Sequence, residues 1–207
     1  MRSRLLPLLA GLLLLSGCES SGVSDYTLYY QALRQDFAAS LSGASRITRA
    51  EAAAIPYASL GYRLNDGPEQ LLVLATDIGG EQLWTSARHV VLVTRNGRLV
   101  RTVGLTHDVS AVTPQRQQQL LPLVDVVDRP LRSVRLEDFP DLGFYGVPVT
   151  CVASSQGLQT IVILGEGIST RKVDEACRSD ALDWSFTDSY WLDPEDGVVW
   201  RSIQHLS

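Results

Sequence analysis

The chain has 207 residues, of which 18 are Lys or Arg and 23 are Asp or Glu, so its formal net charge is −5 at pH 7. Hydrophobic residues make up 45% of the chain and charged residues 20%, which is the composition of a folded globular protein and excludes general disorder. The acidic balance argues against nucleic acid as a partner.

The first residues have the three parts of a bacterial signal peptide. Arg2 and Arg4 precede a leucine-rich stretch at residues 5–15, which ends in Leu15-Ser16-Gly17-Cys18. The stretch has about eleven residues, whereas a membrane-spanning helix needs about twenty. The last four residues match a lipobox, in which the cysteine thiol receives a diacylglycerol. The alternative is an ordinary signal peptide with a chance cysteine, and we favour lipidation of Cys18 because all four residues fall at the cleavage site.

Cleavage before Cys18 predicts a membrane-anchored protein with residues 1–17 removed. Glu19 stands where an aspartate is typical of inner-membrane retention, so we expect the outer membrane. Residues 18–24 predict a lipidated tether, and residues 25–207 a single β-rich domain. Loss of Arg2 and Arg4 leaves a mature net charge of 16 − 23 = −7, so the membrane contact is expected to be through lipid.

Two cysteines remain after Cys18, namely Cys151 and Cys177. A secreted chain enters an oxidising compartment, so we predict a disulfide between them. The competing interpretation is a thiol nucleophile, which needs a histidine base that the fold brings near.

Two helices are predicted before the first strand. Apolar residues recur every three or four positions in residues 24–42, which indicates an amphipathic helix packed on a sheet. Its apolar stripe consists of Tyr26, Tyr29, Tyr30, Leu33, Phe37 and Leu41. Thr48 and Glu51 have the spacing of a capping box, so a second, short helix is expected before Pro56.

The rest of the chain has the pattern of antiparallel strands. Glycine-containing turns separate apolar runs at 71–75 and 82–85, at 89–94 and 98–103, and at 184–192 and 198–203; these turns are Gly79-Gly80, Asn96-Gly97 and Asp196-Gly197. Such dipeptides are typical of hairpins. Further strands are predicted at 123–127, 131–136, 145–153 and 158–164.

Two segments are less regular. Residues 113–121 fit a short helix or an exposed loop, and residues 174–179 fit a polar, helical excursion that carries Cys177. The predicted fold class is mainly antiparallel β, with about nine to eleven strands in a half-open barrel or sandwich and two or three short helices, chiefly N-terminal.

The sequence has no GxSxG elbow, Walker loop or HExxH motif. Its histidines, His89, His107 and His205, are far apart, so we predict no metal site and no cofactor. Carboxylates cluster at residues 137–141 and 193–196, and a glycosidase needs two carboxyl groups about 5 to 10 Å apart. Both clusters also fit solvated turns, which is the interpretation that we favour.

Tryptophans and arginines along the strands form the candidate binding surface. Indoles stack on sugars, and guanidinium groups bind acidic groups, so a long acidic glycan would fit such a surface. The alternative is that the indoles fill the core while the arginines coat the sheet. The candidate residues are Trp84, Arg88, Arg98, Arg101, Trp191, Trp200 and Arg201.

Three segments combine into a recognisable pattern. They are IPYASL at residues 55–60, NGRLVRTVGL at residues 96–105, and a C-terminal set with Trp184-Ser185-Phe186, Tyr190-Trp191-Leu192-Asp193, Gly197 and Trp200-Arg201-Ser202. Together with Cys18 they resemble the YjbF/GfcB lipoproteins, through most of the mature chain. The resemblance implies a periplasm-facing outer-membrane lipoprotein that acts in assembly or export of group 4 capsule or exopolysaccharide, and it implies no catalytic residues.

We therefore expect a non-enzymatic accessory lipoprotein that binds polysaccharide or other export proteins. Two alternatives come from other functional classes. An acyl-chain carrier would need an open apolar cavity inside a half-open barrel, and a periplasmic glycan hydrolase would need the clustered carboxylates to face one another in a groove.

Overall fold

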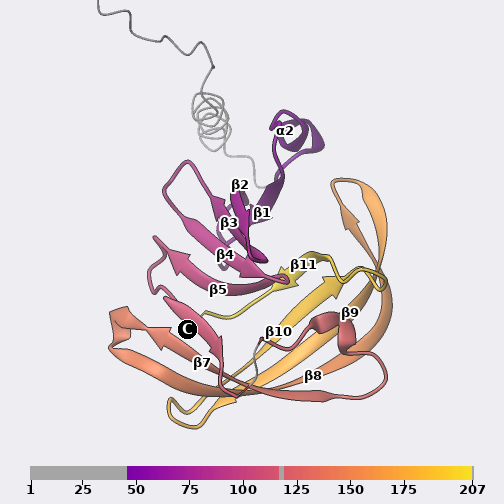
Figure 1. The fold of residues 1–207 in the computed structure, drawn as a ribbon. Helices are drawn as coiled ribbons and strands as arrows, with labels where there is room; N and C mark the ends of the chain where they lie inside the picture. Colours follow the sequence, from indigo (N-terminus) through magenta and orange to yellow (C-terminus); the bar gives the residue numbers. More distant parts are fainter. Residues whose placement is uncertain (1–45, 117–118, 207) are drawn as a thin grey trace, which may run out of the picture.

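The computed structural model describes residues 46–116 and 119–206. Eleven strands form two antiparallel sheets (Figure 1). The smaller sheet has the order β1 (Ser59–Tyr62), β2 (Gln70–Ile78), β3 (Glu81–Thr85), β4 (Val91–Arg95) and β5 (Arg98–Val103). The larger sheet has the order β11 (Val199–Ile203), β10 (Trp184–Leu192), β9 (Glu166–Ser179), β8 (Phe144–Ile163), β7 (Leu131–Phe139) and β6 (Ala111–Pro114).

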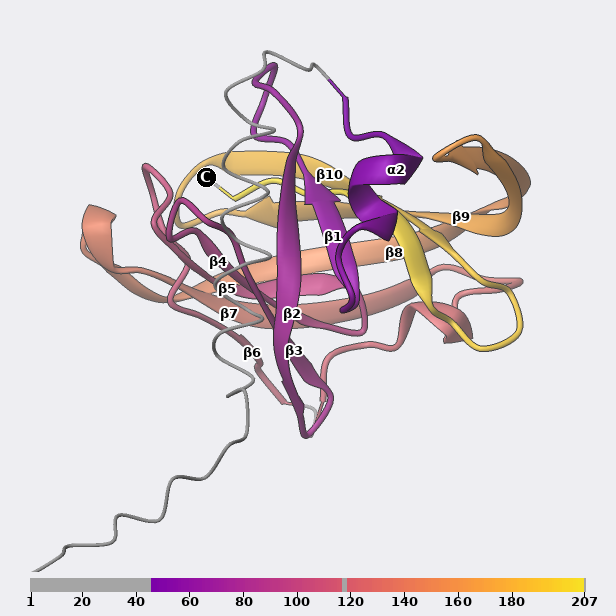
Figure 2. The same cartoon turned by 90° about the horizontal axis from the view of Figure 1, so that it is seen from above.

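The larger sheet is strongly curved, and the smaller sheet lies across its concave side (Figure 1). Seen from above, the strands of the two sheets cross one another rather than running alongside (Figure 2). Side chains alternate along the strands of the larger sheet, so that Val149, Cys151 and Ala153 are buried between the sheets while Val152 is exposed. The predicted class, mainly antiparallel β, is confirmed.

The hairpin at Asn96-Gly97 is confirmed, with β4 and β5 paired on either side of it. Asn96 and Gly97 have φ angles of 50° and 77°, as a type I′ turn requires. A Cβ atom on Gly97 would lie 2.3 Å from Val199 Cγ2, so the turn also touches β11. Glycine therefore serves both the backbone conformation and the close approach of the two sheets.

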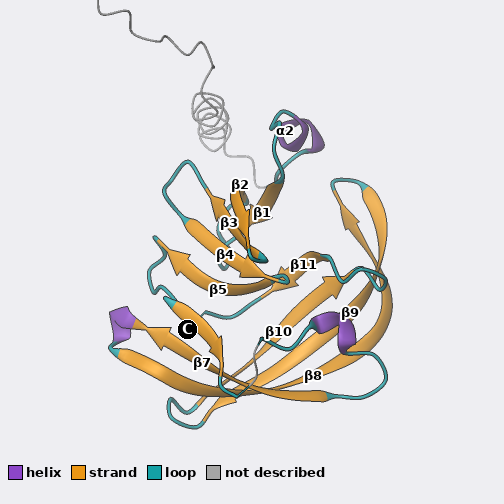
Figure 3. Ribbon diagram, viewed as in Figure 1, coloured by secondary structure: helices purple, strands orange, loops and turns teal. Residues whose placement is uncertain are grey.

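Helix is scarce in this fold (Figure 3). The predicted capping box is confirmed at α2 (Arg49–Ala53), where Thr48 and Glu51 bond each other's backbone N–H groups. It is the one α-helix within the described residues, which also include two 3₁₀ turns, η1 (Leu123–Asp125) and η2 (Pro140–Leu142). Two or three helices are therefore not confirmed, and the amphipathic segment at 24–42 lies outside the described residues. No helix in residues 46–116 and 119–206 has the length and apolar character to cross a membrane.

Four element predictions need correction. Residues 174–179 belong to β9 rather than to a helical excursion, and residues 123–127 contain the 3₁₀ turn η1 (Leu123–Asp125) rather than a strand. Residues 145–153 and 158–164 fall largely in the single strand β8 (Phe144–Ile163), and the start of segment 113–121 belongs to β6. The polar residues at 174–179 were predicted to lie outside a strand because polar residues are usually exposed. Glu175 is instead buried in β9 with charged partners.

The expected disulfide is present between Cys151 of β8 and Cys177 of β9. The two residues are directly opposite in the β8–β9 register, with Cα atoms 4.1 Å apart and an S–S distance of 2.07 Å. The Glu175 carboxylate lies within 4.8 Å of the sulfur atoms, but bonded cysteines offer no thiolate to a metal. The same bond leaves neither cysteine free to act as a nucleophile.

Candidate functional site

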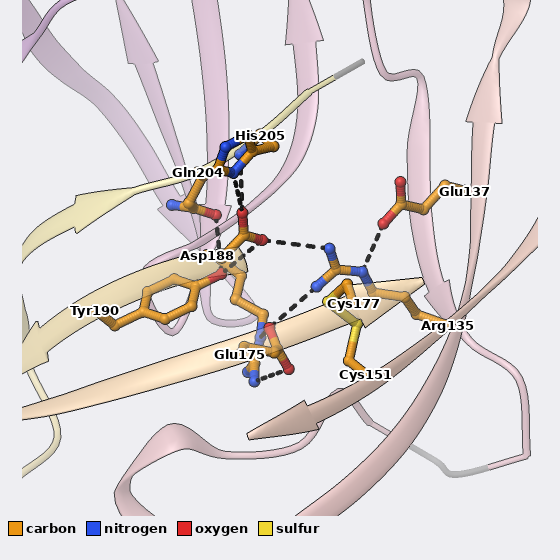
Figure 4. The surroundings of a disulfide bond; sticks show 10 residues. Arg135, Glu137, Cys151, Glu175, Cys177, Asp188, Tyr190, Gln204 and His205 are labelled. Atoms are coloured by element: carbon orange, nitrogen blue, oxygen red, sulfur yellow. Dashed lines mark hydrogen bonds and ion pairs between the residues drawn. A yellow bond between two sulfur atoms is a disulfide. The ribbon is translucent and has the colours of Figure 1, made fainter. Parts of the chain in front are cut away.

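Five charged side chains form a network buried between the two sheets (Figure 4). Each contributing residue has a relative exposure of 7% or less; the five are Arg98, Arg135, Glu137, Glu175 and Asp188. Charges are seldom placed in a protein core unless they are paired, because removal from water costs several kcal/mol per ion. The burial of these five charges therefore has to be explained by the partners that each of them has.

Glu175 lies at the centre of the network. It accepts hydrogen bonds from Nε and Nη2 of Arg98, at 3.2 and 3.0 Å, and from Nη1 of Arg135, at 3.2 Å. Arg135 also bonds Glu137 at 2.5 Å and Asp188 at 3.5 Å. Arg98 comes from the smaller sheet and the other four residues from the larger one, so these ion pairs join the two sheets.

The C-terminal residues close one side of the network. Asp188 accepts a hydrogen bond from the backbone N–H of His205 at 2.8 Å, and its carboxylate lies 3.2 Å from His205 Nδ1. Gln204 donates to the Gly97 carbonyl at 2.9 Å and accepts from the Leu99 N–H at 2.8 Å. The end of the chain thereby bonds both sheets.

Burial and charge shift the pKa values of these groups in different directions. Burial raises the pKa of Glu137, with partial compensation from Arg135, and it raises the pKa of Asp188, with partial compensation from the His205 backbone N–H and from Arg135. Burial also tends to raise the pKa of Glu175, but Arg98 and Arg135 outweigh it, so the net shift is downward. Glu175 thus remains ionised as the shared partner of two guanidinium groups.

Carboxylates with shifted pKa values often mark catalytic sites, but this network lacks access for a substrate. The recess beside it is lined by charged and polar groups, including Arg98, Ser133, Arg135 and Glu175, and has room for roughly one water molecule. The network therefore acts as a structural joint. The same recess gives no room for an acyl chain, so it does not supply the cavity that a lipid carrier needs.

The carboxylates that cluster in the sequence have two different environments. Glu137 is buried in β7 and paired with Arg135, so its assignment to a solvated turn is wrong, whereas the aspartates of both clusters bond backbone N–H groups of turns and loops. Asp138 accepts the Gly146 N–H at 2.6 Å, and Asp141 accepts the Asp108 N–H at 3.1 Å. Asp193 accepts the Glu195 N–H at 2.8 Å. These bonds order the loops, as short acidic side chains commonly do.

The seven candidate surface residues do not form one face. Arg98 is 2% exposed and ion-paired in the core, so its assignment to a surface is wrong. Trp84 of β3 is partly buried and donates to Thr94 Oγ1 at 3.0 Å, while Arg88 and Arg101 are exposed within or beside the smaller sheet. The three C-terminal candidates lie on β10 and β11 of the larger sheet; they are Trp191, Trp200 and Arg201.

A partly exposed cluster of side chains surrounds Trp191 on the outer face of the larger sheet. Tyr190 and Leu192, on either side of Trp191 in β10, are fully buried, so the indole points away from the core. Arg201 is the cross-strand partner of Trp191. We define the Trp191 cluster as one residue from each of four successive strands: Gln159, Lys172, Trp191 and Arg201.

The contacts of the Trp191 cluster combine aromatic, cationic and amide groups. Lys172 Nζ and Arg201 Cζ lie 5.4 and 5.1 Å from the centre of the indole ring, within the range of a cation–π interaction. Gln159 Oε1 accepts the indole N–H at 3.1 Å. Such a cluster offers a cation for an acidic group and amide or aromatic contacts for a sugar ring.

Lys172 and Gln159 were missed from the sequence because only the register of β8, β9 and β10 places them beside Trp191. Lys172 is also paired with Asp174 at 3.0 Å. Arg201 has no ion pair with a carboxylate in the described part of the chain, which leaves its guanidinium available to an acidic ligand.

Comparisons with known proteins agree with the pattern in the sequence. A family model described as "Group 4 capsule polysaccharide lipoprotein gfcB, YjbF" matches residues 30–207. The chain is 30% identical to the uncharacterized lipoprotein GfcB of Escherichia coli K12, over 94% of this chain and 88% of that protein. It is 28% identical to the uncharacterized lipoprotein YjbF of the same strain, over 73% of this chain and 70% of that one.

A solved structure has the same fold. The crystal structure of the hypothetical lipoprotein YmcC from Escherichia coli K12 matches with a TM-score of 0.68 and 29% identity, covering 82% of this chain and 87% of that chain. The family model covers well over half of the sequence and includes all the described strands. The chain therefore belongs to the YjbF family of group 4 capsule polysaccharide lipoproteins.

Proposed function

We propose that this protein is a non-enzymatic accessory lipoprotein for assembly or export of a capsule-type polysaccharide, anchored by lipid on Cys18 in the outer membrane and facing the periplasm. The family match over residues 30–207 is the observation that carries the proposal. The lipobox at residues 15–18 supports the anchor, and Glu19 after the cysteine favours the outer membrane.

Within this proposal, the Trp191 cluster binds the polymer. Gln159 and Arg201 of the cluster are exposed to solvent. Asp174 lies beside the cluster, where it pairs with Lys172 and accepts a hydrogen bond from the Ser189 hydroxyl at 2.7 Å. Arg201 binds an acidic sugar through its guanidinium, while Gln159 and Asp174 bond ring hydroxyls. The alternative within the same pathway is that this face binds another export protein.

Deleting the gene in its host is expected to abolish or strongly reduce cell-surface and secreted polysaccharide. Wild-type protein should restore the polymer, whereas Cys18→Ala should not, because loss of two or three acyl chains removes firm membrane attachment. Quantifying polysaccharide and the membrane-bound fraction of the protein measures both effects. Unchanged polymer after deletion would withdraw the proposed function, and unchanged membrane attachment of Cys18→Ala would withdraw the anchor.

Arg201→Ala is expected to weaken binding of the host's acidic polysaccharide by about tenfold, which is the loss of one charged hydrogen-bonding partner. Arg101→Ala is the matched control, because it removes the same charge from an exposed position on the smaller sheet. Binding of purified polymer is measured by surface-immobilised titration with both variants. If Arg201→Ala and Arg101→Ala bind the polymer with equal affinity, the Trp191 cluster is not the polymer site. If the wild-type protein does not bind the polymer at all, this face is more consistent with binding of a protein partner.

A further inference from the structure

The outward side chains of β10 form a row that begins in the Trp191 cluster. Phe186, Asp188 and Tyr190 are buried in the core, so the residues between and beside them point to the outer face of the larger sheet. We define the β10 row as the four outward residues Ser185, Thr187, Ser189 and Trp191. No bulge interrupts the pairing of β10 with β9, so the row spans about 20 Å along the strand.

The β10 row offers hydroxyl groups along its length. Ser185 and Thr187 are exposed, and Ser189 is half-buried. The cross-strand partner of Thr187 in β9 is Ala176, and β11 pairs with β10 only as far as Ser189. In the described chain, no long side chain of a paired strand therefore stands beside the middle of the row. Hydroxyl groups both donate and accept hydrogen bonds, which suits the hydroxyls of a sugar chain.

Cationic side chains of β9 lie beside both ends of the row. Lys172 is the cross-strand partner of Trp191, and Arg178 is the partner of Ser185. On β11 and the part of β9 paired with β10, the charged residues of the outer face are Lys172, Asp174, Arg178 and Arg201. Their net charge is 3 − 1 = +2, whereas the whole chain carries −5. A basic surface on an acidic protein favours acidic ligands.

Arg178 is available to an acidic group of a ligand. Its one ion pair in the described chain is with Asp180, at 2.5 Å, and the two side chains are 68% and 87% exposed. An exposed pair of this kind contributes less than about 1 kcal/mol, so a carboxylate of a ligand can replace Asp180. The row thus has an available arginine beside each end, namely Arg178 and Arg201.

We propose that the polymer site extends along the β10 row, so that an acidic polysaccharide lies along β10 with one acidic group at the Trp191 cluster and another at Arg178, about 20 Å away. Hydroxyl groups of the row bond the sugars between them. The inference rests on the proposed polymer binding and deepens it, because it makes the ligand an extended stretch of charged polymer rather than a single acidic sugar. Two linked contacts on one chain bind more tightly than either contact alone.

Binding of oligosaccharides of graded length tests the extended site. The protein is the mature chain from residue 18 with Cys18→Ser, and the probes are fractions of the host's acidic polysaccharide obtained by partial hydrolysis. Calorimetry is expected to show an affinity that rises with length until a fraction spans about 20 Å and then levels off. Arg178→Ala should weaken binding of the long fractions roughly fivefold and should leave the short fractions unchanged.

Arg132→Ala is the matched control, because Arg132 is also exposed on the outer face of the larger sheet, but on β7, three strands from β10. A second pair of variants adds a carboxylate in place of removing an arginine. Thr187→Glu, in the middle of the row, should weaken the long fractions by repulsion of their acidic groups. Thr113→Glu makes the same exchange at an exposed threonine of the edge strand β6 and should leave their binding unchanged.

Two results would overturn the extended site. They are an affinity that does not depend on length, and an Arg178→Ala variant that binds the long fractions as tightly as Arg132→Ala does. If Arg201→Ala still weakens binding in either case, the Trp191 cluster stays the polymer site and the proposed function stands. If the wild-type sequence binds no fraction at all, polymer binding itself is withdrawn, and the extended site is withdrawn with it.

Discussion

Glu175→Gln is expected to lower the free energy of unfolding by about 3 to 5 kcal/mol, the usual cost of removing one partner from a buried ion pair. Within the described residues, Glu175 is the one carboxylate bonded to Arg98, whereas Arg135 also bonds Glu137 and Asp188. The substitution therefore leaves the Arg98 guanidinium buried without a carboxylate partner, with the Leu121 carbonyl and one amide oxygen of the new side chain as its acceptors. In a domain of this size the melting temperature should fall by roughly 6 to 20 °C.

Asp180→Asn is the matched control for this effect. It also replaces a carboxylate by an amide in an ion pair with an arginine, but Asp180 and Arg178 have exposed side chains, at 87% and 68%. Exposed pairs contribute less than about 1 kcal/mol, so the variant should unfold close to the wild type. Chemical denaturation of both variants gives the comparison, and a Glu175→Gln variant as stable as Asp180→Asn would contradict a structural role for the network.

The strands that lose protection from hydrogen exchange in Glu175→Gln provide a second measurement. Arg98 begins β5 of the smaller sheet, and Glu175 lies in β9 of the larger one. Loss of their bond should loosen the contact between sheets before it disturbs pairing within either sheet. Hydrogen exchange in Glu175→Gln should accordingly rise at the edge strand β5 more than in the centre of the larger sheet.

The sequence was informative wherever local chemistry decides the structure. The Asn96-Gly97 turn, the capping box of Thr48 and Glu51, and the hairpin at Asp196-Gly197 each depend on a few neighbouring residues. The structure of each can therefore be predicted from the spacing and type of its residues alone. The family pattern includes residues of both hairpins, though not those of the capping box.

The rest of the fold depends on contacts between distant residues. Arg98 and Glu175 are 77 positions apart, and neither residue type predicts burial on its own. The prediction consequently placed Arg98 on a surface and mistook the end of β9 for a polar excursion. An ion pair between residues of two different sheets cannot be predicted until the pairing of the strands is known.

The candidate site shows the same division. Trp191 and Arg201 were predicted as part of a surface of tryptophans and arginines along the strands, and the structure makes them cross-strand partners. Trp84, Arg88 and Arg101 were grouped with them by residue type only, and the structure places them in or beside the smaller sheet. Residue type thus identified the kind of chemistry, and strand register decided which residues share it.

Removing the disulfide with the double substitution Cys151→Ala and Cys177→Ala is expected to cost roughly 3 kcal/mol of stability, the chain-entropy effect of a loop of this size. The sequence separation is 26 residues, and the bond joins the two central strands of the larger sheet. Both cysteines are buried, so a reductant should act on the unfolded chain rather than on the native fold. The melting temperature should fall by roughly 6 to 12 °C.

The double variant supplies its own control when both proteins carry Cys18→Ser. Adding reductant during thermal unfolding should lower the melting temperature of the wild-type disulfide protein toward that of the double variant, and should leave the variant unchanged. Thiol trapping followed by mass spectrometry should detect no free cysteine before unfolding begins. Equal melting temperatures with and without the bond would mean that the pairing of β8 with β9, together with the Glu175 network beside it, already restricts the chain as much as the disulfide does.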